Sequence, residues 1–554
     1  MSSAQSSPVE RIATEGYDVV VVGAGFAGMY MLHRLRGLGF SARLFEQGGG
    51  VGGTWYWNRY PGARCDVESM QYSYSFSEEL QQEWDWSERY APQPEILKYA
   101  NHVADRFDLR RDIQFSTRVE RAAFDERSNS WSVTTSDGKT VNARFVVLAT
   151  GCLSNARKPD INGLENFKGP VYHTGNWPHE PVDFTGLRVA LIGTGSSGIQ
   201  SAPVIAEQAK HLTVFQRTAN FSIPARNAAL TDEEREAFRK NYPEIRRFAR
   251  EVARNGIYAQ QPDRGALDDD ADARRGKYEA RWERGGLTFM YVYNNLGLDR
   301  TANDTAANFV RGKIAEIVSD PETAKLLQPN SHPIGTKRIC IDTDYFATFN
   351  RPNVSLVEIK TNPIQEITAN AVRVAGTDHE VDALVLATGF DAMTGSVAKI
   401  DIRGRGGQTL NQKWAEGPKT YLGLMSAGFP NLFIITGPGS PSVLSNMIVS
   451  IEQHVDWIAD GLVHMRKHGL ATMEAGRAAE DKWVTHVNEV AHGTLYPQAN
   501  SWYMGANIPG KPRIFMPYIG GVGVYRQICN DVAAKGYEGF VMERAVQPEA
   551  AAAS

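Results

Sequence analysis

The sequence predicts an α/β protein with two Rossmann-like dinucleotide-binding domains, because a strand, a glycine-rich turn and a helical pattern follow one another twice. The first copy starts at Tyr17 and has its turn at Gly23–Gly28. The second starts near Leu187 and has its turn at Gly193–Gly198. The chain of 554 residues is longer than one hydrophobic core can serve, so we expect two principal cores.

The first copy contains every part of a dinucleotide-binding fingerprint. The apolar run YDVVVV precedes GAGFAG, and a second strand is expected from Ser41 to Phe45. Glu46 ends that strand, where a carboxylate can bind ribose hydroxyls. The glycines allow close approach to a pyrophosphate, and the helix N-terminus offers unpaired N–H groups. The residues expected to bind the cofactor here are Gly23, Gly25, Phe26, Ala27, Gly28 and Glu46.

The second copy differs at the position that selects the cofactor. Gln216 stands where the first copy has Glu46, and Arg217 follows it. A carboxylate would repel a 2′-phosphate, whereas an amide beside an arginine accepts one, so NADPH is expected over NADH. Alternatively, Arg217 is only a solvated arginine at a strand end. Pro203 inside the helical pattern predicts a kink. The residues expected here are Gly193, Thr194, Gly195, Ser196, Ser197, Gly198, Arg217 and Thr218.

Two strands ending in Thr-Gly, at 148–151 and 386–389, indicate the domain order. We expect a FAD-binding domain in two pieces, residues 15–150 and 390–545, interrupted by an NADP-binding domain at 151–389. Inside the interruption, the charged segment 225–330 is expected to be a mostly helical insertion. Residues 1–14 and 546–554 are expected to be flexible ends.

Composition excludes several function classes. The 59 Lys and Arg against 63 Asp and Glu give a net charge of −4, which provides no field for nucleic acid or an anionic membrane surface. No apolar stretch is long enough for a membrane span and no signal peptide is evident, so a cytoplasmic protein without membrane insertion is expected. The four cysteines are too far apart for a redox disulfide or a metal site. Electrons are therefore expected to pass from NADPH to FAD and then to O2, with no obligatory protein partner.

The segment FKGPVYHTGNWP, residues 167–178, directly precedes the second copy. It resembles the F-x-G-x-x-x-H-x-x-x-W-P fingerprint of type I Baeyer–Villiger monooxygenases. The segment GTWYWNRYPGARCD, residues 53–66, is similar to the family's second signature. The resemblance covers nearly the whole chain and is strongest to the phenylacetone and steroid monooxygenase branch. The matching residues are Phe167, Gly169, His173, Trp177 and Pro178 in the fingerprint, and Gly53, Thr54, Trp55, Tyr60 and Asp66, expected near the cofactors.

The resemblance implies that FAD, NADPH and O2 convert ketones into esters or lactones through a C4a-peroxyflavin, with sulfoxidation as a side activity. It assigns to Arg338 the cation beside the peroxide, because arginine keeps its proton, and to Asp66 the carboxylate that orients it. It implies Lys337 as a second 2′-phosphate contact and Trp502 as part of a closing loop, although a core role for Trp502 is equally compatible. It also implies an apolar substrate pocket. The pocket residues are Pro441, Ser442, Val443, Leu444 and Met447.

Two alternatives remain open on sequence alone. An N- or S-oxidising flavin monooxygenase has a similar layout but lacks the Trp177-Pro178 pair. A non-catalytic flavin- and NADP-binding sensor would need neither Asp66 nor Arg338. His173 is not interpreted as a general base, because insertion of oxygen beside a ketone abstracts no proton. By resemblance, His173 and Trp177 couple domain motion to cofactor binding.

Overall fold

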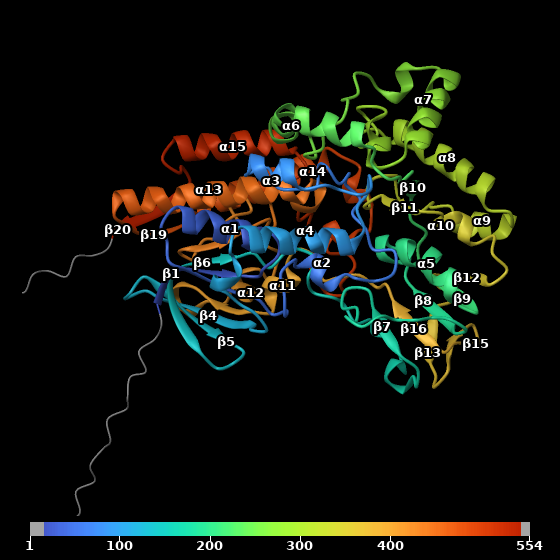
Figure 1. Cartoon of the computed structure of the whole chain (residues 1–554), viewed down its shortest axis with the longest axis horizontal. Coiled ribbons are helices and arrows are strands. Elements are labelled where there is room, and N and C mark those ends of the chain that lie inside the picture. Colours follow the sequence, from blue (N-terminus) through green and yellow to red (C-terminus); the bar gives the residue numbers. More distant parts are fainter. Residues whose placement is uncertain (1–15, 545–554) are drawn as a thin grey trace, which may run out of the picture.

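The computed structural model describes residues 16–544, so the ends expected to be flexible lie outside the described residues. Two sheets of largely parallel strands lie side by side in Figure 1, the first at the left and the second at the right. This arrangement is the α/β fold with two Rossmann-like units that the repeated turns predict. Within residues 16–544, no helix is both long and apolar enough to cross a membrane.

The first sheet is built around β1 (Gly16–Val22), whose valines at positions 19–21 are completely buried. Its order is β17-β4-β5-β6-β1-β2-β3, and β18 pairs with β6. β17 (Asp401–Arg403) and β18 (Leu432–Ile434) follow the second sheet in the chain, so two separate pieces of sequence form the first unit. The other strands are β2 (Ala42–Phe45), β3 (Ile113–Gln114), β4 (Val119–Asp125), β5 (Ser130–Thr135) and β6 (Thr140–Leu148).

Helices from both pieces cover the first sheet. α1 (Phe26–Gly37) packs along α13 (Met447–His468), and both bury apolar side chains in one core cluster. Gly469 ends α13 in the left-handed conformation, with basic residues in the last turn. The remaining elements of this unit are α2 (Thr54–Trp57), α3 (Glu78–Glu83), α4 (Gln93–Arg106), α11 (Gly395–Ala398), α12 (Leu410–Lys413), α14 (Arg477–His492), α15 (Val522–Ala534), β19 (Leu470–Ala475) and β20 (Phe540–Arg544).

The second sheet consists of five parallel strands in the order β12-β9-β8-β16-β7. α5 (Ser196–Gln208) follows its glycine turn and continues through Pro203 without ending. The strands are β7 (Val171–His173), β8 (Arg188–Ile192), β9 (His211–Gln216), β12 (Val354–Glu358) and β16 (Ala383–Leu386). Nearby lie the pair β10 (Ser222–Pro224) and β11 (Cys340–Asp342), the meander β13 (Ile364–Ile367), β14 (Ala371–Val374) and β15 (Thr377–Glu380), and the short helix α10 (Tyr345–Thr348).

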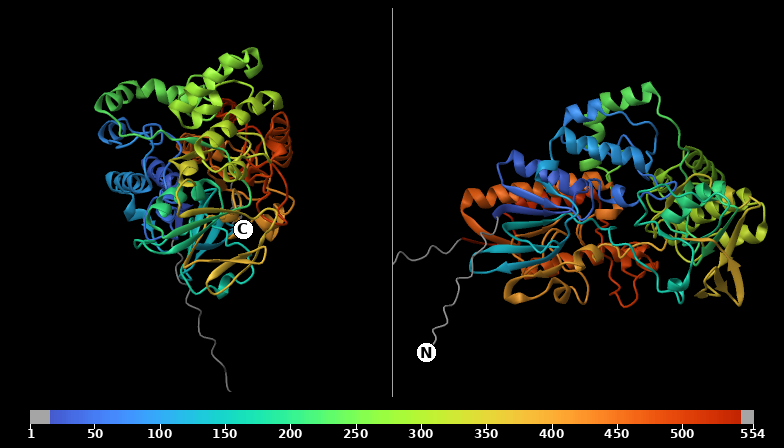
Figure 2. Two further views of the ribbon diagram at one scale, coloured as in Figure 1. Left: turned by 90° about the vertical axis from the view of Figure 1, so that its right-hand side faces the viewer. Right: turned by 60° about the horizontal axis from the view of Figure 1, so that its bottom comes forward.

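The charged segment forms α6 (Asp232–Glu251), α7 (Ala271–Arg284), α8 (Arg300–Ile317) and α9 (Pro321–Leu327). α7, α8 and α9 pack on the core of the second unit. α6 differs from the expectation, because it packs on the first unit, beside α15 in Figure 1, and the right view of Figure 2 shows it next to the blue helices of the first piece. The buried guanidinium of Arg246 explains this position, since it donates to the carbonyls of Met70 and Gln71 in the first unit.

Two linkers, residues 149–157 and 387–393, join the units. They run antiparallel and are hydrogen-bonded to each other. Arg157 N donates to Gly389 O at 3.0 Å, and Asp391 N donates to Asn155 O at 2.9 Å. The two connections therefore form one double-stranded crossing between the units.

Candidate functional site

The first glycine turn forms a narrow backbone cradle. Gly23 has φ +103°, and a Cβ there would lie 2.7 Å from the carbonyl oxygen of Ala149. A Cβ on Gly28 would overlap the carbonyl oxygen of Gly23. Gly25 precedes α1, which begins at Phe26 and Ala27, so the N-terminus of the helix opens onto the turn. This cradle fits a dinucleotide pyrophosphate, which needs close backbone approach.

Glu46 lies at the end of β2 and is turned toward the same cradle. Its Oε2 accepts the N–H of Ala24 at 2.6 Å, and its Oε1 accepts the N–H of Gly48 at 2.6 Å. The carboxyl group is buried, and burial raises its pKa although the two backbone donors oppose the rise. The carboxylate therefore stands beside the glycine turn, where a ribose would lie.

The second signature crosses the first turn. Gly53 has φ +53°, and a Cβ there would lie only 2.8 Å from Gly25 Cα. Gly53 precedes α2, whose first residue, Thr54, is exposed. Trp55 is buried and its Nε1 donates to the hydroxyl of Tyr72 at 3.1 Å. Gly53 thus lies against the first glycine turn and forms one side of the cradle, although a helix and a strand separate it from Gly25 in the sequence.

The second glycine turn repeats the first. Gly193 has φ +114°, and a Cβ on either Gly193 or Gly198 would overlap a backbone carbonyl oxygen. Gly195 precedes α5, and Thr194 Oγ1 donates to Thr218 O at 2.8 Å. Two serines of the turn contact other parts of the site: Ser197 Oγ lies 3.0 Å from Thr174 Oγ1, and Ser196 Oγ lies 3.4 Å from Cys340 Sγ.

Two cations stand beside the second turn. Arg217 is exposed at the end of β9, and Lys337 is partly buried. The pKa of Lys337 is lowered by burial and by the charge of Arg217, so the two side chains repel each other. A phosphate group between them would relieve that repulsion. The amide of Gln216 is turned away, because its Nε2 donates to Leu326 O at 2.8 Å.

The second signature also reaches the second unit. The hydroxyl of Tyr60 donates to Gln200 Oε1 at 2.8 Å, and Gln200 Nε2 donates to Arg64 O at 3.1 Å. Gln200 belongs to α5, and a Cβ on Gly62 would overlap its backbone. These contacts fix the segment that carries Asp66 at the interface of the two units.

Asp66 from the first unit meets Arg338 from the second. Arg338 Nε donates to Asp66 Oδ2 at 2.8 Å, and Nη2 donates to Oδ1 at 2.7 Å. The remaining terminal nitrogen, Nη1, donates to Val443 O at 2.7 Å. The side chains are 25% and 23% exposed. Burial would lower the pKa of Arg338, but Asp66 outweighs it and the pKa is raised, so this guanidinium is a permanent cation.

His173 of the fingerprint contacts both linkers. Its Nδ1 accepts the N–H of Gly175 at 3.0 Å, so Nε2 carries the proton. Nε2 lies 3.0 Å from Arg157 O and 3.3 Å from Thr388 Oγ1. Burial lowers the pKa of this imidazole. His173 is therefore a neutral link between the two linkers.

The other fingerprint residues are structural contacts around β7. Trp177 is buried against Tyr172, with ring centroids 5.2 Å apart, and its backbone N–H donates to Trp57 O at 3.4 Å. A Cβ on Gly169 would overlap the carbonyl oxygen of Asp382. Phe167 is buried in the apolar cluster beside β13 and β14, and Pro178 is partly buried.

The predicted substrate wall surrounds the short helix η6 (Ser442–Leu444). Ser442 is completely buried with φ +42°, and Pro441 precedes it. Val443, Leu444 and Met447 belong to one apolar cluster that also contains Trp502. Trp502 lies at the edge of this cluster, with its ring 4.2 Å from that of Tyr503. Sequence reasoning missed other cluster members, because no local pattern marks them. These are Cys152, Met393, Tyr503, Phe515 and Met516.

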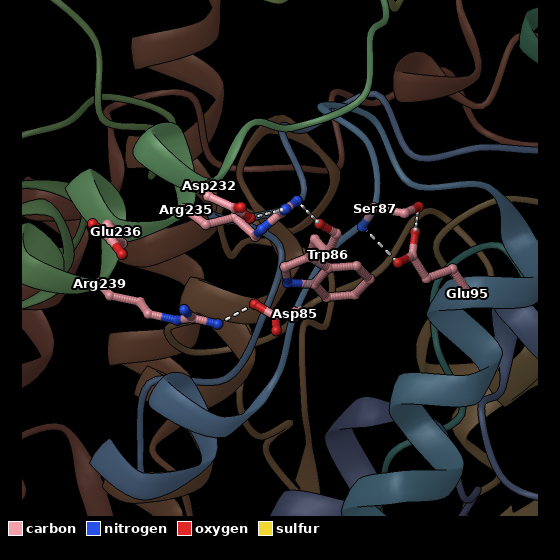
Figure 3. Close-up of a pocket in the computed structure, with 8 residues that line it drawn as sticks. All are labelled: Asp85, Trp86, Ser87, Glu95, Asp232, Arg235, Glu236 and Arg239. Carbon is pink, nitrogen blue, oxygen red and sulfur yellow. Dashed lines mark hydrogen bonds and ion pairs between the residues drawn. The ribbon is translucent and has the colours of Figure 1, made fainter.

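A surface hollow of about 400 Å³ lies elsewhere, between residues 85–95 and α6. Figure 3 shows that its charged residues pair with one another, as Arg239 does with Asp85 and Arg235 with Asp232. Glu95 is bonded to Ser87 in the same hollow. None of the site residues predicted from the sequence lines it. In the described part of the chain, no group of three or more acidic, histidine or cysteine side chains is placed to hold a metal.

Residues 17–255 match the family model described as pyridine nucleotide-disulphide oxidoreductase. A Baeyer-Villiger monooxygenase of Pseudooceanicola batsensis is 42% identical over 538 residues, 96% of this chain and 97% of that relative. A phenazine N-monooxygenase of Lysobacter antibioticus is 42% identical over 530 residues, 95% of this chain and 97% of that relative. The structure titled oxidized steroid monooxygenase bound to NADP has a TM-score of 0.92 at 53% identity and covers 96% of this chain and 100% of that one.

Fold and site together define an enzyme with one FAD-binding and one NADP-binding unit. The matching chains extend this agreement over almost the whole length. The protein belongs to the FAD- and NADPH-dependent Baeyer–Villiger monooxygenases. Its four cysteines, Cys65, Cys152, Cys340 and Cys529, are free and buried.

Proposed function

We propose that this enzyme oxidises ketones to esters or lactones with NADPH and O2. The observation that carries the proposal is the Arg338 guanidinium, held by Asp66 and by the carbonyl of Val443. A protein that only binds the two nucleotides does not need a fixed cation at the interface of its two nucleotide units. An oxygen-transfer enzyme needs one, because the reaction develops negative charge on oxygen and a preorganised cation stabilises that charge.

When bound, FAD reduced by NADPH would activate O2, of which one oxygen atom is transferred to the substrate and the other leaves as water. The chain's own residues orient and protect that chemistry. Asp66 holds the guanidinium plane of Arg338 through two hydrogen bonds, and Val443 O fixes its other edge. Since arginine does not lose its proton at working pH, the charge is constant through the cycle.

No general base is required for oxygen insertion. The histidine of the fingerprint agrees with this, because both nitrogens of His173 are already hydrogen-bonded to backbone or linker groups. We assign His173 and Trp177 to the coupling of the two units. They link the crossing between the units to the segment that carries Asp66.

The remaining roles form part of the same proposal. The FAD contacts are Gly23, Gly25, Phe26, Ala27, Gly28, Glu46, Gly53, Thr54, Trp55, Tyr60 and Asp66. The NADPH contacts are Gly193, Thr194, Gly195, Ser196, Ser197, Gly198, Arg217, Thr218, Lys337 and Trp502. The ketone would lie against Pro441, Ser442, Val443, Leu444 and Met447.

The proposal is tested with the FAD-loaded enzyme, NADPH and a panel of linear, cyclic and aryl ketones. Each reaction is followed by NADPH consumption and by product analysis. We expect ester or lactone equal to the NADPH consumed for at least one ketone. The same balance in the Arg338→Ala variant, or NADPH consumption that yields only hydrogen peroxide with every ketone, would contradict the proposal.

A second candidate is N-oxidation of an aromatic heterocycle. The observation that favours it is the similarity to the phenazine N-monooxygenase, which equals the similarity to the Baeyer-Villiger monooxygenase of Pseudooceanicola batsensis. The same panel therefore includes phenazine and a tertiary amine. An N-oxide formed in balance with NADPH, without ester from any ketone, would favour this second candidate.

A further inference from the structure

The loop of residues 435–441 joins β18 to η6, the short helix that carries the proposed substrate wall. Arg338 depends on the end of this connection, because its Nη1 donates to Val443 O at 2.7 Å. Asp66 holds the other edge of the guanidinium. The position of the cation is therefore set from two sides, by a carboxylate and by the backbone that follows the loop.

Two residues of this connection have a left-handed backbone. Thr436 has φ +56° and Ser442 has φ +42°. A positive φ is unfavourable for a residue with a Cβ, and most of all for a β-branched residue such as threonine. The two residues are coupled, because Ser442 Oγ donates to Thr436 O at 3.1 Å. Such a conformation persists only where surrounding groups hold it, so the contacts of Thr436 bear on the backbone that reaches Val443.

His454 holds Thr436 from α13. Its Nδ1 accepts the N–H of Thr436 at 2.8 Å, and the residue is completely buried. The imidazole lies against Tyr525, with ring centroids 5.5 Å apart, and the hydroxyl of Tyr525 donates to Leu422 O. Burial lowers the pKa of His454 to about 3, so the imidazole is neutral at working pH. Nδ1 is therefore a constant acceptor, held in place by the packing of its own ring.

A histidine is a costly residue at this buried position. Since Nδ1 accepts, Nε2 carries the proton, and within residues 16–544 this nitrogen is buried without a hydrogen-bond partner. An unpaired buried N–H is unfavourable, and an apolar side chain of similar size would avoid it. The bond to Thr436 is the one hydrogen bond that the imidazole forms with the described part of the chain. This favours the acceptor atom, rather than packing, as the role of His454.

We infer that His454 is a positioning residue for oxygen transfer, because its bond to Thr436 fixes the connection whose end holds the guanidinium of Arg338. From His454 the contacts continue through the carbonyl of Thr436 to the hydroxyl of Ser442. Val443, the next residue, accepts from Arg338. The inference rests on the proposed ketone oxidation and adds to it a residue behind the substrate wall.

His454→Asn and His454→Gln separate the acceptor from the packing. Asparagine places an amide oxygen near the position of Nδ1, whereas glutamine places its amide near that of Nε2. The FAD-loaded variants are assayed with NADPH and the ketone that gives the wild type its highest ester yield. His454→Asn should keep most of the ester formed per NADPH, and His454→Gln should lower the ratio of ester to hydrogen peroxide about tenfold. A role in packing alone predicts the opposite order, because glutamine is closer to histidine in volume.

Flavin reduction by NADPH without oxygen should keep its wild-type rate in both variants, because the connection acts on oxygen transfer and not on hydride transfer. Amide hydrogen exchange over residues 435–443 provides a readout that does not depend on activity. It should be faster in His454→Gln than in the wild type or in His454→Asn.

Gln453→Leu is the matched control, because Gln453 is buried on the same helix and its side-chain amide does not bond the loop. It should leave the exchange and the ester yield at their wild-type values, whatever its effect on the free energy of unfolding. Ser442→Ala removes the next contact, the hydroxyl that donates to Thr436 O, and should lower the ester ratio in the same direction as His454→Gln.

Equal exchange in His454→Gln and His454→Asn would overturn the positioning role and leave ketone oxidation standing. An ester yield of His454→Gln at or above that of His454→Asn, or a wild-type ratio in Ser442→Ala, would do the same. A wild type that forms no ester from any ketone would overturn the proposed function, and with it the role of His454 in oxygen transfer.

Discussion

Asp66→Asn tests whether the interface ion pair works in catalysis rather than in stability. The variant keeps the shape of the side chain but removes its charge and one of the two hydrogen bonds to Arg338, now 2.8 and 2.7 Å long. Breaking a hydrogen-bonded charge pair that is about one-quarter exposed costs roughly 2 kcal/mol, below the range for fully buried pairs. If that energy acts on oxygen transfer, ester formation falls about 30-fold.

The assay measures ester formed, hydrogen peroxide released and NADPH consumed by the FAD-loaded variant. We expect NADPH consumption to continue while the fraction that yields ester falls. Asp382→Asn is the control, because Asp382 forms a similar two-bond pair with Arg188, at 3.1 and 2.8 Å, on the outside of the second sheet. The reasoning is refuted if Asp66→Asn keeps the wild-type ester yield per NADPH, or if Asp382→Asn lowers it equally.

Three further predictions concern cofactor selection, cofactor retention and pH. Arg217→Ala should raise KM for NADPH by about tenfold or more and change KM for NADH little, because only NADPH carries the 2′-phosphate; equal changes would show that Arg217 is only a surface cation. Gly28→Ala should give protein without bound FAD by absorbance, because its Cβ would overlap the carbonyl oxygen of Gly23, whereas Gly37→Ala has open space and should remain yellow. Burial lowers the pKa of His454 from 6.5 to about 3. Between these two values, His454 binds a proton in the unfolded chain but stays neutral in the folded chain. The free energy of unfolding should therefore fall as the pH drops from 6.5 toward 3, and denaturant titrations that show no such fall would contradict this.

The two glycine turns could be predicted from the sequence because their structural requirements are local. Gly23 and Gly193 have positive φ, and the Cβ positions at Gly28 and Gly198 are filled by backbone of the same turn. Such constraints appear in a short window of sequence. Glu46 was predictable for the same reason, since one helix and one strand determine its distance from the turn.

The pairing of Asp66 with Arg338 lies beyond local reasoning. The two residues are 272 positions apart, and neither neighbourhood has a periodicity that marks a partner. Only resemblance to a family suggested that they meet. Val443 contributes a backbone carbonyl, for which the side-chain sequence contains no signal.

The position of α6 could not be predicted from the sequence for a different reason. The charged composition of residues 225–330 predicts a mostly helical insertion, and one of its helices is present over Asp232–Glu251. That composition does not say on which unit the helix packs. Arg246 is a charged residue that a sequence reading places in solvent, yet it is 5% exposed and bonded to carbonyls of the first unit. Tertiary partners thus decide where the helix packs.

The fingerprint residues His173 and Trp177 lie close to the interface between the two units. Asp66 belongs to one unit and Arg338 to the other, so their 2.7 and 2.8 Å hydrogen bonds exist only at one relative position of the two units. That position depends on the paired linkers, and His173 is hydrogen-bonded within this crossing. Trp177 bonds the backbone of Trp57, in the segment that leads to Asp66. We therefore propose that the fingerprint acts on catalysis by setting where the two halves of the ion pair meet, which would explain why a chemically inert histidine can characterise an oxygen-transfer enzyme.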